Sequence, residues 1–243
     1  MNKLKGFIKY LLFLSGFILH HNRDSKVIYY HDVGRRYTQM GTPLDVIKKQ
    51  IELIKKHRFE LVPFITSRTN QVMVAFDDGW KGLYEERDFF IKNGITPTVF
   101  IAVDLIGREG FMDIHQIREL QAEGFIFESH TWSHKGLPDF ISDESLWHEL
   151  YDSKCKLESI IGKEISALCF PQGRFTDRVI EKSKMAGYKT LYSSIPGGAF
   201  DLCDRGILCR VLFADISINQ VRFVLEGRSS FYRKKIINNH YSR

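Results

Sequence analysis

The sequence predicts an α/β fold in which parallel strands are connected by helices. Apolar, strand-like segments alternate with segments of helical period along almost the whole chain, an order typical of parallel strands joined by right-handed crossovers. Seven or eight such units favour a barrel over an open sheet. Hydrophobic residues make up 44% of the 243 positions, which is enough for one large core. No internal repeat or linker divides the chain, so we expect one domain.

The first half of the chain contains apolar runs bounded by polar or glycine-containing turns, which are typical of strands. We place these strands at residues 26–30, 59–64, 72–76, 98–103 and 125–128. Helices are expected between them at residues 44–57, 84–92 and 114–122. In the first helix, Ile47, Ile51 and Ile54 recur at helical spacing and should form its buried face. Asn93-Gly94 is a typical stop signal for the second helix.

The second half of the chain continues the same alternation. A helix is expected from Ser142, an N-cap residue followed by acids that favour the helix dipole, to about Ile161. Thr176 is the predicted cap of the next helix, which ends at Ala186-Gly187. The strands of this half are predicted at residues 165–170, 189–193 and 207–213, and the last helix at residues 218–226.

Two adjacent carboxylates follow the predicted strand at residues 72–76. Burying two like charges is costly, so Asp77 and Asp78 are expected outside the core, at the carboxyl-terminal mouth where α/β folds place their chemistry. Gly79 allows a sharp turn directly after them. This stretch alone is equally compatible with an ordinary Asp-Asp-Gly turn, so other residues must decide between the two interpretations.

Two further polar segments follow predicted strands and are candidates to complete a site. His130 and His134 are four residues apart, and on one face of a helical turn both imidazoles reach one ion. One carboxylate with two histidines is a set that binds Zn²⁺, Fe²⁺, Co²⁺ or Ni²⁺ and leaves positions open, as catalytic metal sites do. Pro171-Gln172-Gly173 forms a polar turn at the same mouth. Two surface histidines and an ordinary turn are the alternative.

These segments resemble the motifs of a known family. Phe76-Asp77-Asp78-Gly79 and His130-Thr131-x-x-His134 are similar to the first two motifs of the polysaccharide deacetylases (NodB-homology proteins, carbohydrate esterase family 4). The resemblance covers residues 27–227. It implies a distorted (β/α) barrel, commonly with seven strands, and hydrolysis of N-acetyl groups on amino sugars. Further matching segments are Tyr30-His31-x-Val33, Phe170-Pro171-x-Gly173 and Ala186-Gly187-Tyr188.

The resemblance also implies a role for each matching residue. Asp77 corresponds to the general base. The backbone N–H of Gln172 falls where the family stabilises the oxyanion, and Thr131 corresponds to the residue that steadies the histidine loop. The implied cofactor is a divalent ion, most often Zn²⁺, with Co²⁺, Ni²⁺ and Fe²⁺ as alternatives. The residues that correspond to its ligands are Asp78, His130 and His134.

The third motif departs from the family's pattern. Many members carry an arginine shortly before the proline of this motif, and that arginine holds the catalytic aspartate. The corresponding positions here are Leu168, Cys169 and Phe170. The tyrosine usual in the turn is replaced by Gln172. Two arginines elsewhere are candidates to replace the missing one, and the sequence does not choose between Arg174 and Arg210.

The histidine that supplies the general acid is also missing from its usual place. The family carries it in a late Leu-x-His motif, but no histidine lies between His148 and His240. One subgroup of the family supplies it from an N-terminal Tyr-His motif, which Tyr30-His31 matches. His31 is therefore the candidate acid, and a histidine with no catalytic role is the alternative.

The expected function is metal-dependent hydrolysis of an amide on a carbohydrate. Such an enzyme would remove N-acetyl groups from a polysaccharide, an oligosaccharide or a lipid-linked glycan and release acetate. One alternative is hydrolysis of another non-peptide C–N amide bond on the same scaffold. Another is an inactive relative that only binds carbohydrate. Trp80 and Trp132 flank the two motifs and are candidates for stacking on a sugar ring or for packing alone.

The ends of the chain are basic and carry much of the net charge of +6. We expect an apolar, basic N-terminal helix (residues 1–25), a deacetylase-like domain (residues 26–228) and a basic tail (residues 229–243). The apolar run at residues 10–19 is shorter than the roughly 20 residues that span a bilayer, and no cleavage site follows it. Peripheral membrane contact through an interfacial helix is therefore expected, with solvated tails as the alternative.

These features favour a membrane-associated or cytoplasmic location over export. The chain contains no nucleic-acid-binding motif, so we expect a carbohydrate partner and no nucleic acid. The four cysteines form no Cys-x-x-Cys pair and no disulfide framework, which indicates reduced thiols. The sequence makes no prediction about the oligomeric state.

Overall fold

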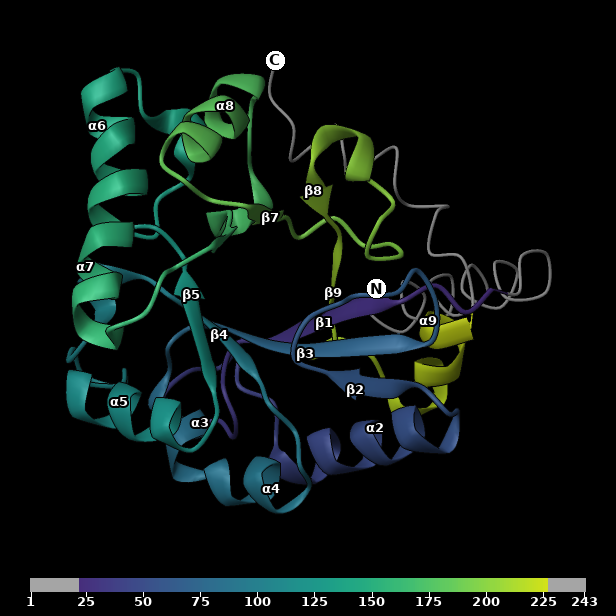
Figure 1. The fold of residues 1–243 in the computed structure, drawn as a ribbon. Helices are drawn as coiled ribbons and strands as arrows, with labels where there is room; N and C mark the ends of the chain where they lie inside the picture. Colours follow the sequence, from purple (N-terminus) through teal and green to yellow (C-terminus); the bar gives the residue numbers. More distant parts are fainter. Residues whose placement is uncertain (1–21, 227–243) are drawn as a thin grey trace, which may run out of the picture.

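A parallel β-sheet with helices packed on its outside forms the fold in the computed structural model (Figure 1). The structure describes residues 22–226. The predicted N-terminal anchor (residues 1–25, apart from its last four residues) and the basic tail (residues 229–243) lie outside this described part. The predicted α/β class is confirmed.

All the strand pairs of the sheet are parallel, as the alternation of strands and helices predicts. The strand order is β8-β7-β6-β5-β4-β3-β1-β9, and β2 pairs with β3 beside this path. The strands are β1 (Lys26–Tyr30), β2 (Glu60–Val62), β3 (Gln71–Asp78), β4 (Thr98–Ile101), β5 (Ile126–Ser129), β6 (Ala167–Cys169), β7 (Thr190–Tyr192), β8 (Ile207–Leu208) and β9 (Arg210–Leu212).

The two ends of this strand order are consecutive in the sequence. Only Cys209 separates β8 from β9. Because β8 pairs with β7 and β9 pairs with β1, this single stretch joins both edges of the sheet. With β8 and β9 taken as one strand and β2 set aside, seven parallel strands follow one another, which agrees with the distorted seven-stranded barrel implied by the resemblance.

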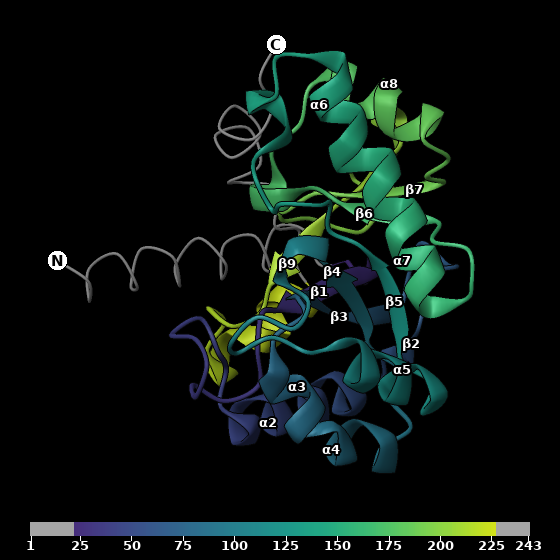
Figure 2. The same cartoon turned by 90° about the vertical axis from the view of Figure 1, so that its left-hand side faces the viewer.

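The helices surround the sheet, and the two views show them along its outer face (Figures 1 and 2). Their predicted caps are present: the side chains of Ser142 and Thr176 accept hydrogen bonds from the N–H groups of Ser145 and Val179. The helices are α2 (Leu44–Lys56), α3 (Lys81–Glu85), α4 (Arg87–Lys92), α5 (Ile114–Ala122), α6 (Asp143–Trp147), α7 (Ser153–Ile161), α8 (Asp177–Met185) and α9 (Val221–Glu226).

Three predicted elements are interrupted. The helix expected at residues 84–92 is divided into α3 and α4, because the backbone at Glu86 leaves the helical region (φ −104°, ψ 15°). The helix expected from Ser142 to Ile161 contains a π-helical turn, His148–Asp152, between α6 and α7. The last predicted strand is split at Cys209. Hydrophobic periodicity does not reveal such local breaks, since one altered turn barely changes the apolar pattern.

The side chains of β1 and β3 alternate between two hydrophobic clusters, as the two-residue period of a strand requires. Ile28 and Val74 belong to the large cluster shared with the helices. Tyr29, Met73 and Ala75 belong to a smaller cluster on the other face of the sheet. Asp77 lies two positions after Ala75 on the same strand. Its carboxylate is therefore directed to the same side as Met73 and Ala75, toward the inner face of the barrel.

A buried carboxyl after β1 caps a helix that has no cap of its own. The N-cap residue of α3, Trp80, makes no side-chain capping bond. Asp32 instead accepts hydrogen bonds from the N–H groups of Val33, Gly82 and Leu83. Residue 82 must be glycine, because a Cβ there would lie 2.4 Å from Oδ1 of Asp32. Burial raises the pKa of Asp32 to about 7 despite these bonds.

Asp32→Asn is expected to remove a pH dependence of stability. An acid whose folded pKa is raised binds its proton more tightly in the folded state, so wild-type stability falls as pH rises from about 4 to about 7. Relative to the variant, wild type should lose on the order of 1–3 kcal/mol of unfolding free energy between pH 4.5 and 7.5. Urea denaturation at both pH values measures this difference. A constant difference would contradict the assignment.

Other sequence-based expectations concern membranes and thiols. No helix within residues 22–226 has the length and apolarity needed to cross a bilayer. The four cysteines are free, as expected; Cys169 and Cys209 are buried, and Cys155 and Cys203 are exposed.

Candidate active site

The predicted site residues lie at the carboxyl ends of four strands, at the carboxyl-terminal mouth of the barrel. Parallel strands bring their carboxyl ends to one edge, so residues far apart in sequence meet there. His31 follows β1, the two aspartates end β3, the histidine pair follows β5, and Gln172 follows β6. The structure therefore collects all of them at one end of the fold.

Asp77 and Asp78 are buried, with exposed fractions of 3% and 5%. The expectation that both stay outside the core is wrong. Both are the last residues of β3, not the start of a turn. Burial of two like charges is tolerated because each carboxylate has its own polar partners. Those partners differ, and they separate the two residues chemically.

Asp77 forms a bidentate ion pair with Arg210, the first residue of β9. The guanidinium donates to both carboxylate oxygens, at 2.7 Å and 2.8 Å. Burial alone would raise the pKa of Asp77, but the charge and the hydrogen bonds of Arg210 outweigh burial and hold this pKa below its ordinary value. Asp77 is therefore an ionised carboxylate at neutral pH, as a proton acceptor must be.

Arg210 is fully buried and fixed on all sides. Its Nε donates to the carbonyl oxygen of Ser193 at 3.1 Å. The guanidinium lies over the rings of Tyr29 and Phe100, with its Cζ 4.1 Å and 5.3 Å from their centroids. The other candidate, Arg174, instead pairs with Asp139 at 2.7 Å. Of the two arginines that the sequence left open, Arg210 is the one that holds Asp77.

Asp78 faces the two histidines of the predicted metal set. Its Oδ1 lies 3.1 Å from Nε2 of His134 and 3.6 Å from Nε2 of His130. Its Oδ2 accepts a hydrogen bond from the indole N–H of Trp80 at 3.0 Å. Burial would raise the pKa of Asp78, but its contacts with the two histidines outweigh burial and hold this pKa well below its ordinary value.

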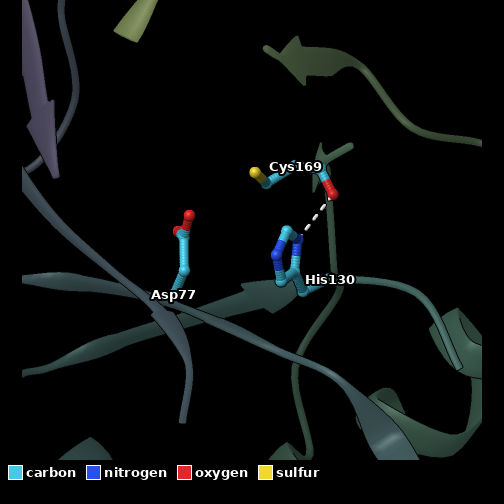
Figure 3. Close-up of side chains that lie close together, drawn as sticks. All are labelled: Asp77, His130 and Cys169. Atoms are coloured by element: carbon cyan, nitrogen blue, oxygen red, sulfur yellow. Dashed lines mark hydrogen bonds between the residues drawn. The ribbon is translucent and has the colours of Figure 1, made fainter. Parts of the chain in front are cut away.

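The hydrogen bond at Nδ1 of His130 determines which ring nitrogen carries the proton. Nδ1 lies 2.7 Å from the carbonyl oxygen of Cys169 (Figure 3). A carbonyl only accepts, so Nδ1 carries the proton and donates it. Burial lowers the pKa of His130 to about 4, so the ring is neutral at pH 7. Its Nε2 therefore presents a lone pair toward the aspartates.

The Asp78 set fits a divalent cation. In the described part of the chain, Oδ1 of Asp78 has no hydrogen-bond partner of acceptable geometry, although it is buried. This oxygen and the lone pair of His130 Nε2 face each other as two acceptors. Such an arrangement suits a positive group between them. The candidate ligand atoms of Asp78, His130 and His134 all lie within 4.8 Å of one another.

A second set shares His130 and contains Asp77 and Cys169 (Figure 3). This set is a poorer cation site. Both oxygens of Asp77 already accept hydrogen bonds from the Arg210 guanidinium, whose positive charge would repel an ion. Burial raises the pKa of the Cys169 thiol well above its ordinary value, so the thiolate that metals bind is disfavoured. The chemistry of the donors thus selects the Asp78 set.

The loop that carries both histidines is not helical. The expected helical turn is wrong, because Thr131 (φ 69°) and His134 (φ 60°) adopt left-handed conformations. The two rings still converge, with centroids 4.8 Å apart. Thr131 is fully buried, and its carbonyl oxygen accepts a hydrogen bond from the N–H of Val103 at 3.1 Å. Its role in steadying the loop stays a prediction.

His31 and Gln172 lie at the same mouth. The ring of His31 packs edge-on against Tyr29, with centroids 5.8 Å apart, and its charge contributes to lowering the pKa of both Asp77 and Asp78. Gln172 adopts a left-handed conformation (φ 58°) within the short 3₁₀ turn Pro171–Gly173, and it is exposed. The assigned roles of these two residues stay predictions.

The two tryptophans that flank the motifs are held by neighbouring side chains. Trp80 stacks on Phe111 with centroids 4.0 Å apart and donates to Asp78, so its indole orients a candidate metal ligand. Sequence reasoning missed this role; an indole two residues after a carboxylate at a strand end is the signal that was present. Trp132 packs against the ring of His148, with centroids 4.5 Å apart.

A family model described as polysaccharide deacetylase matches residues 47–191, more than half of the chain. The chain belongs to the polysaccharide deacetylase family. The matched region contains both aspartates, both histidines and Gln172. His31 and Arg210 lie outside it, so their assignments depend on the geometry of this particular deacetylase-family member.

Known proteins of similar sequence and structure agree with this family. YxkH of Bacillus subtilis (strain 168), named after the same family, is 26% identical over 129 residues, which are 53% of this chain and 46% of YxkH. The peptidoglycan-N-acetylmuramic acid deacetylase PdaA of the same organism is 24% identical over 63% of this chain and 57% of PdaA. The chain thus spans about half the length of these relatives.

The fold also matches a solved structure. The Streptococcus pyogenes deacetylase PplD, solved in complex with acetate, superimposes with a TM-score of 0.74 at 18% identity, over 84% of this chain and 99% of PplD. At this identity the likeness demonstrates the fold alone. The fold agrees with the distorted barrel expected from the sequence motifs.

Proposed function

We propose that this protein is a metal-dependent deacetylase that removes N-acetyl groups from amino sugars and releases acetate. The observation that carries the proposal is the buried Asp78 Oδ1, which has no hydrogen-bond partner and lies 3.6 Å from Nε2 of His130, beside the ionised Asp77 at the barrel mouth. Two facing acceptors favour a cation between them, and the separate ionised carboxylate beside them supports the role of a base. An inactive carbohydrate-binding relative would require neither feature.

Asp78, His130 and His134 would hold the ion. One carboxylate oxygen and two imidazole nitrogens suit Zn²⁺ best, and Co²⁺, Ni²⁺ and Fe²⁺ also accept such a set. When bound, a divalent ion polarises an acetyl carbonyl and lowers the pKa of a water to about 7. The hydrogen bond from His130 to the carbonyl of Cys169 and the bond from Trp80 to Asp78 fix the orientation of two of the ligands.

The remaining residues divide the proton transfers. Asp77, fixed by Arg210, takes a proton from the water that attacks the amide carbon. The N–H of Gln172 donates to the oxyanion that develops on the acetyl oxygen. His31 donates a proton to the amide nitrogen, so the amine leaves and the C–N bond breaks. Acetate and a free amino sugar are the products.

The substrate class is an N-acetylated amino sugar in a polysaccharide, an oligosaccharide or a lipid-linked glycan. Membership of the family supports a carbohydrate substrate, and the name of the relative PdaA adds peptidoglycan to the candidates. The basic, apolar N-terminal residues support a membrane-associated location, with a cytoplasmic one as the alternative. Membrane and soluble fractions of the full chain, probed separately, test this placement.

His130→Ala is expected to abolish stoichiometric metal binding, because it removes one of the three candidate ligands, and this ligand is buried. His134→Ala, at a partly exposed position, should have the same effect with less disturbance of the core. His115→Ala is the matched control, since the His115 side chain is 81% exposed. Elemental analysis after dialysis measures the metal content. Tight 1:1 metal in both ligand variants would refute the ligand assignment.

The activity itself is tested by acetate release. Zn²⁺- or Co²⁺-loaded protein is incubated with chitooligosaccharides, peptidoglycan fragments and lipid-linked N-acetylamino sugars, and free acetate and free amine are both measured. Acetate and amine in equal amounts from one of these substrates are expected. Release of amine from a cyclic amide without any acetate would favour the other amidohydrolase activity. Loaded, folded protein that cleaves none of them would refute the proposal.

His31→Gln is expected to lower kcat for acetate release by about 10²–10⁴-fold, the usual contribution of a general acid. Metal content should stay unchanged, because His31 is not in the ligand set. His115→Gln is again the control. Rates within threefold of wild type in the His31 variant would show that another group protonates the leaving nitrogen.

A further inference from the structure

The interrupted helix between β5 and β6 places a buried carboxylate against the histidine loop, which comprises residues 130–134. Glu149 lies in the π-helical turn His148–Asp152, and its exposed fraction is only 3%. π-turns are rare, and they often occur at functional sites because they re-aim a side chain.

Within residues 22–226, every hydrogen bond to the Glu149 carboxylate comes from the loop of residues 130–134. Oε2 accepts from the backbone N–H groups of Trp132, at 3.1 Å, and Ser133, at 2.9 Å. Oε1 accepts from the hydroxyl of Ser133 at 2.6 Å. Within residues 22–226 no lysine or arginine forms an ion pair with Glu149. The buried charge is thus balanced by donors from this loop.

The loop needs such support. Trp132 and Ser133 lie between Thr131 and His134, which are both non-glycine residues in the left-handed region, where side chains are strained. Consecutive N–H groups next to a left-handed residue form a concave anion-binding nest. Glu149 occupies this nest. The conformation that brings His130 and His134 together is therefore the one that also binds the carboxylate.

The opposite side of the loop is anchored separately. The carbonyl oxygens of Thr131 and Trp132 accept hydrogen bonds from the N–H groups of Val103 and Asp104, at 3.1 Å and 2.9 Å. These bonds fix the start of the loop against the 3₁₀ turn Val103–Leu105, which follows β4. They leave the N–H groups of Trp132 and Ser133, which precede His134, to Glu149 alone.

We propose that Glu149 is a positioning residue that holds the loop of residues 130–134 in its metal-binding conformation. Glu149 acts through the loop backbone and touches neither the ion nor the substrate. This inference rests on the proposed metal site. It predicts that the affinity for a divalent ion depends on a residue of the helix layer that contributes no ligand atom.

The test measures Co²⁺ and Zn²⁺ binding to the metal-free protein by calorimetric titration, without any activity assay. Glu149→Ala should weaken Kd by about 10–100-fold, the usual effect of losing a group that orients metal ligands. Glu149→Gln should stay within about tenfold of wild type, because an amide oxygen can accept both N–H bonds while the amide NH₂ donates to the Ser133 hydroxyl. Glu144→Ala, at an exposed position of α6, should bind as wild type.

The visible absorption spectrum of the Co²⁺ protein gives a second readout that a general loss of stability would not change in folded protein. Glu149→Ala should alter the spectrum, and Glu149→Gln should largely restore it. If the alanine variant does not fold, Glu149→Asp replaces it, since the shorter side chain keeps the charge but cannot reach both N–H groups. Glu149→Asp should also bind Co²⁺ and Zn²⁺ at least tenfold more weakly than wild type.

The possible outcomes separate this inference from the proposed function. Wild-type Kd and spectrum in every folded Glu149 variant would overturn the positioning role while leaving the metal site intact. Failure of wild-type protein itself to bind either ion would instead refute the proposed function. Equal weakening in Glu149→Ala and Glu144→Ala would also overturn the inference, because the effect would then belong to the helix and not to the carboxylate.

Discussion

Replacing Asp77 by asparagine is expected to lower kcat/KM for acetate release by about 10²–10⁴-fold while the metal stays bound. The loss equals the usual contribution of a general base, because an amide cannot accept the proton of the attacking water. The metal remains because the cation is assigned to Asp78 and the two histidines, and not to Asp77. Acetate release and elemental analysis on the same protein sample measure both quantities.

Asp77→Asn also leaves the buried Arg210 without its counter-charge, and this loss by itself destabilises the fold. The double variant Asp77→Asn/Arg210→Gln separates the two effects, since it removes both charges together. Its stability should recover relative to the single variant, while its activity should remain lost. Recovery of activity in the double variant would mean that the buried charge, and not the missing base, caused the loss. Near-normal turnover in the single variant would contradict the base assignment.

Arg210→Gln is expected to lower the free energy of unfolding by about 3–5 kcal/mol at pH 7, the usual cost of removing one partner of a buried ion pair. The guanidinium makes two hydrogen bonds to Asp77 and one to Ser193, and it packs between two rings. Without it, Asp77 is a buried, unpaired carboxylate. Its pKa should then rise, so the base should be partly protonated and the rate of acetate release should fall.

The pH dependence identifies the ion pair as the cause. In wild type the folded pKa of Asp77 is depressed, so the stabilisation is present above the unfolded pKa of about 4 and is lost as pH falls through the folded value. Between pH 7 and pH 4 this contribution is therefore constant in wild type. In Arg210→Gln the unpaired Asp77, with its raised pKa, takes up a proton over the same range and its buried charge is removed. The difference between wild type and Arg210→Gln should therefore shrink from pH 7 to pH 4 in urea denaturation. Arg210→Lys should lie between them, because an ammonium keeps the charge but not the bidentate geometry. A pH-independent difference would point to lost packing alone.

The fold class could be predicted because each strand and helix carries its own local pattern. Ile47, Ile51 and Ile54 recur at helical spacing and are buried as expected, and the caps at Ser142 and Thr176 are present. The breaks at Glu86, His148–Asp152 and Cys209 could not be predicted. Each changes a single turn or residue, which leaves the hydrophobic period almost unaltered.

The site could be predicted only in part. The sequence motifs predicted Asp78, His130 and His134 as one set of metal ligands, and the structure places their donor atoms together. The expectation that the aspartates avoid the core was wrong, because the cost of burying Asp77 is offset by a guanidinium 133 positions later in the chain. The contacts of Trp80 and Glu149 also went unpredicted. Glu149 lies one residue before the buried Leu150 of the π-turn, and an acid at such a position is a signal that sequence reasoning did not use.

The sequence by itself determined the candidate residues for the chemistry: two carboxylates at a strand end and two histidines four residues apart. It also determined the family to which these motifs belong. Residue type and spacing are local properties, so one chain is enough to read them. Only the tertiary structure decided between Arg174 and Arg210, separated the partners of Asp77 from those of Asp78, and left Asp78 Oδ1 facing His130 Nε2. Ion pairs and unsatisfied acceptors depend on distances between residues of different strands. Those distances are set by the tertiary fold and not by the local sequence.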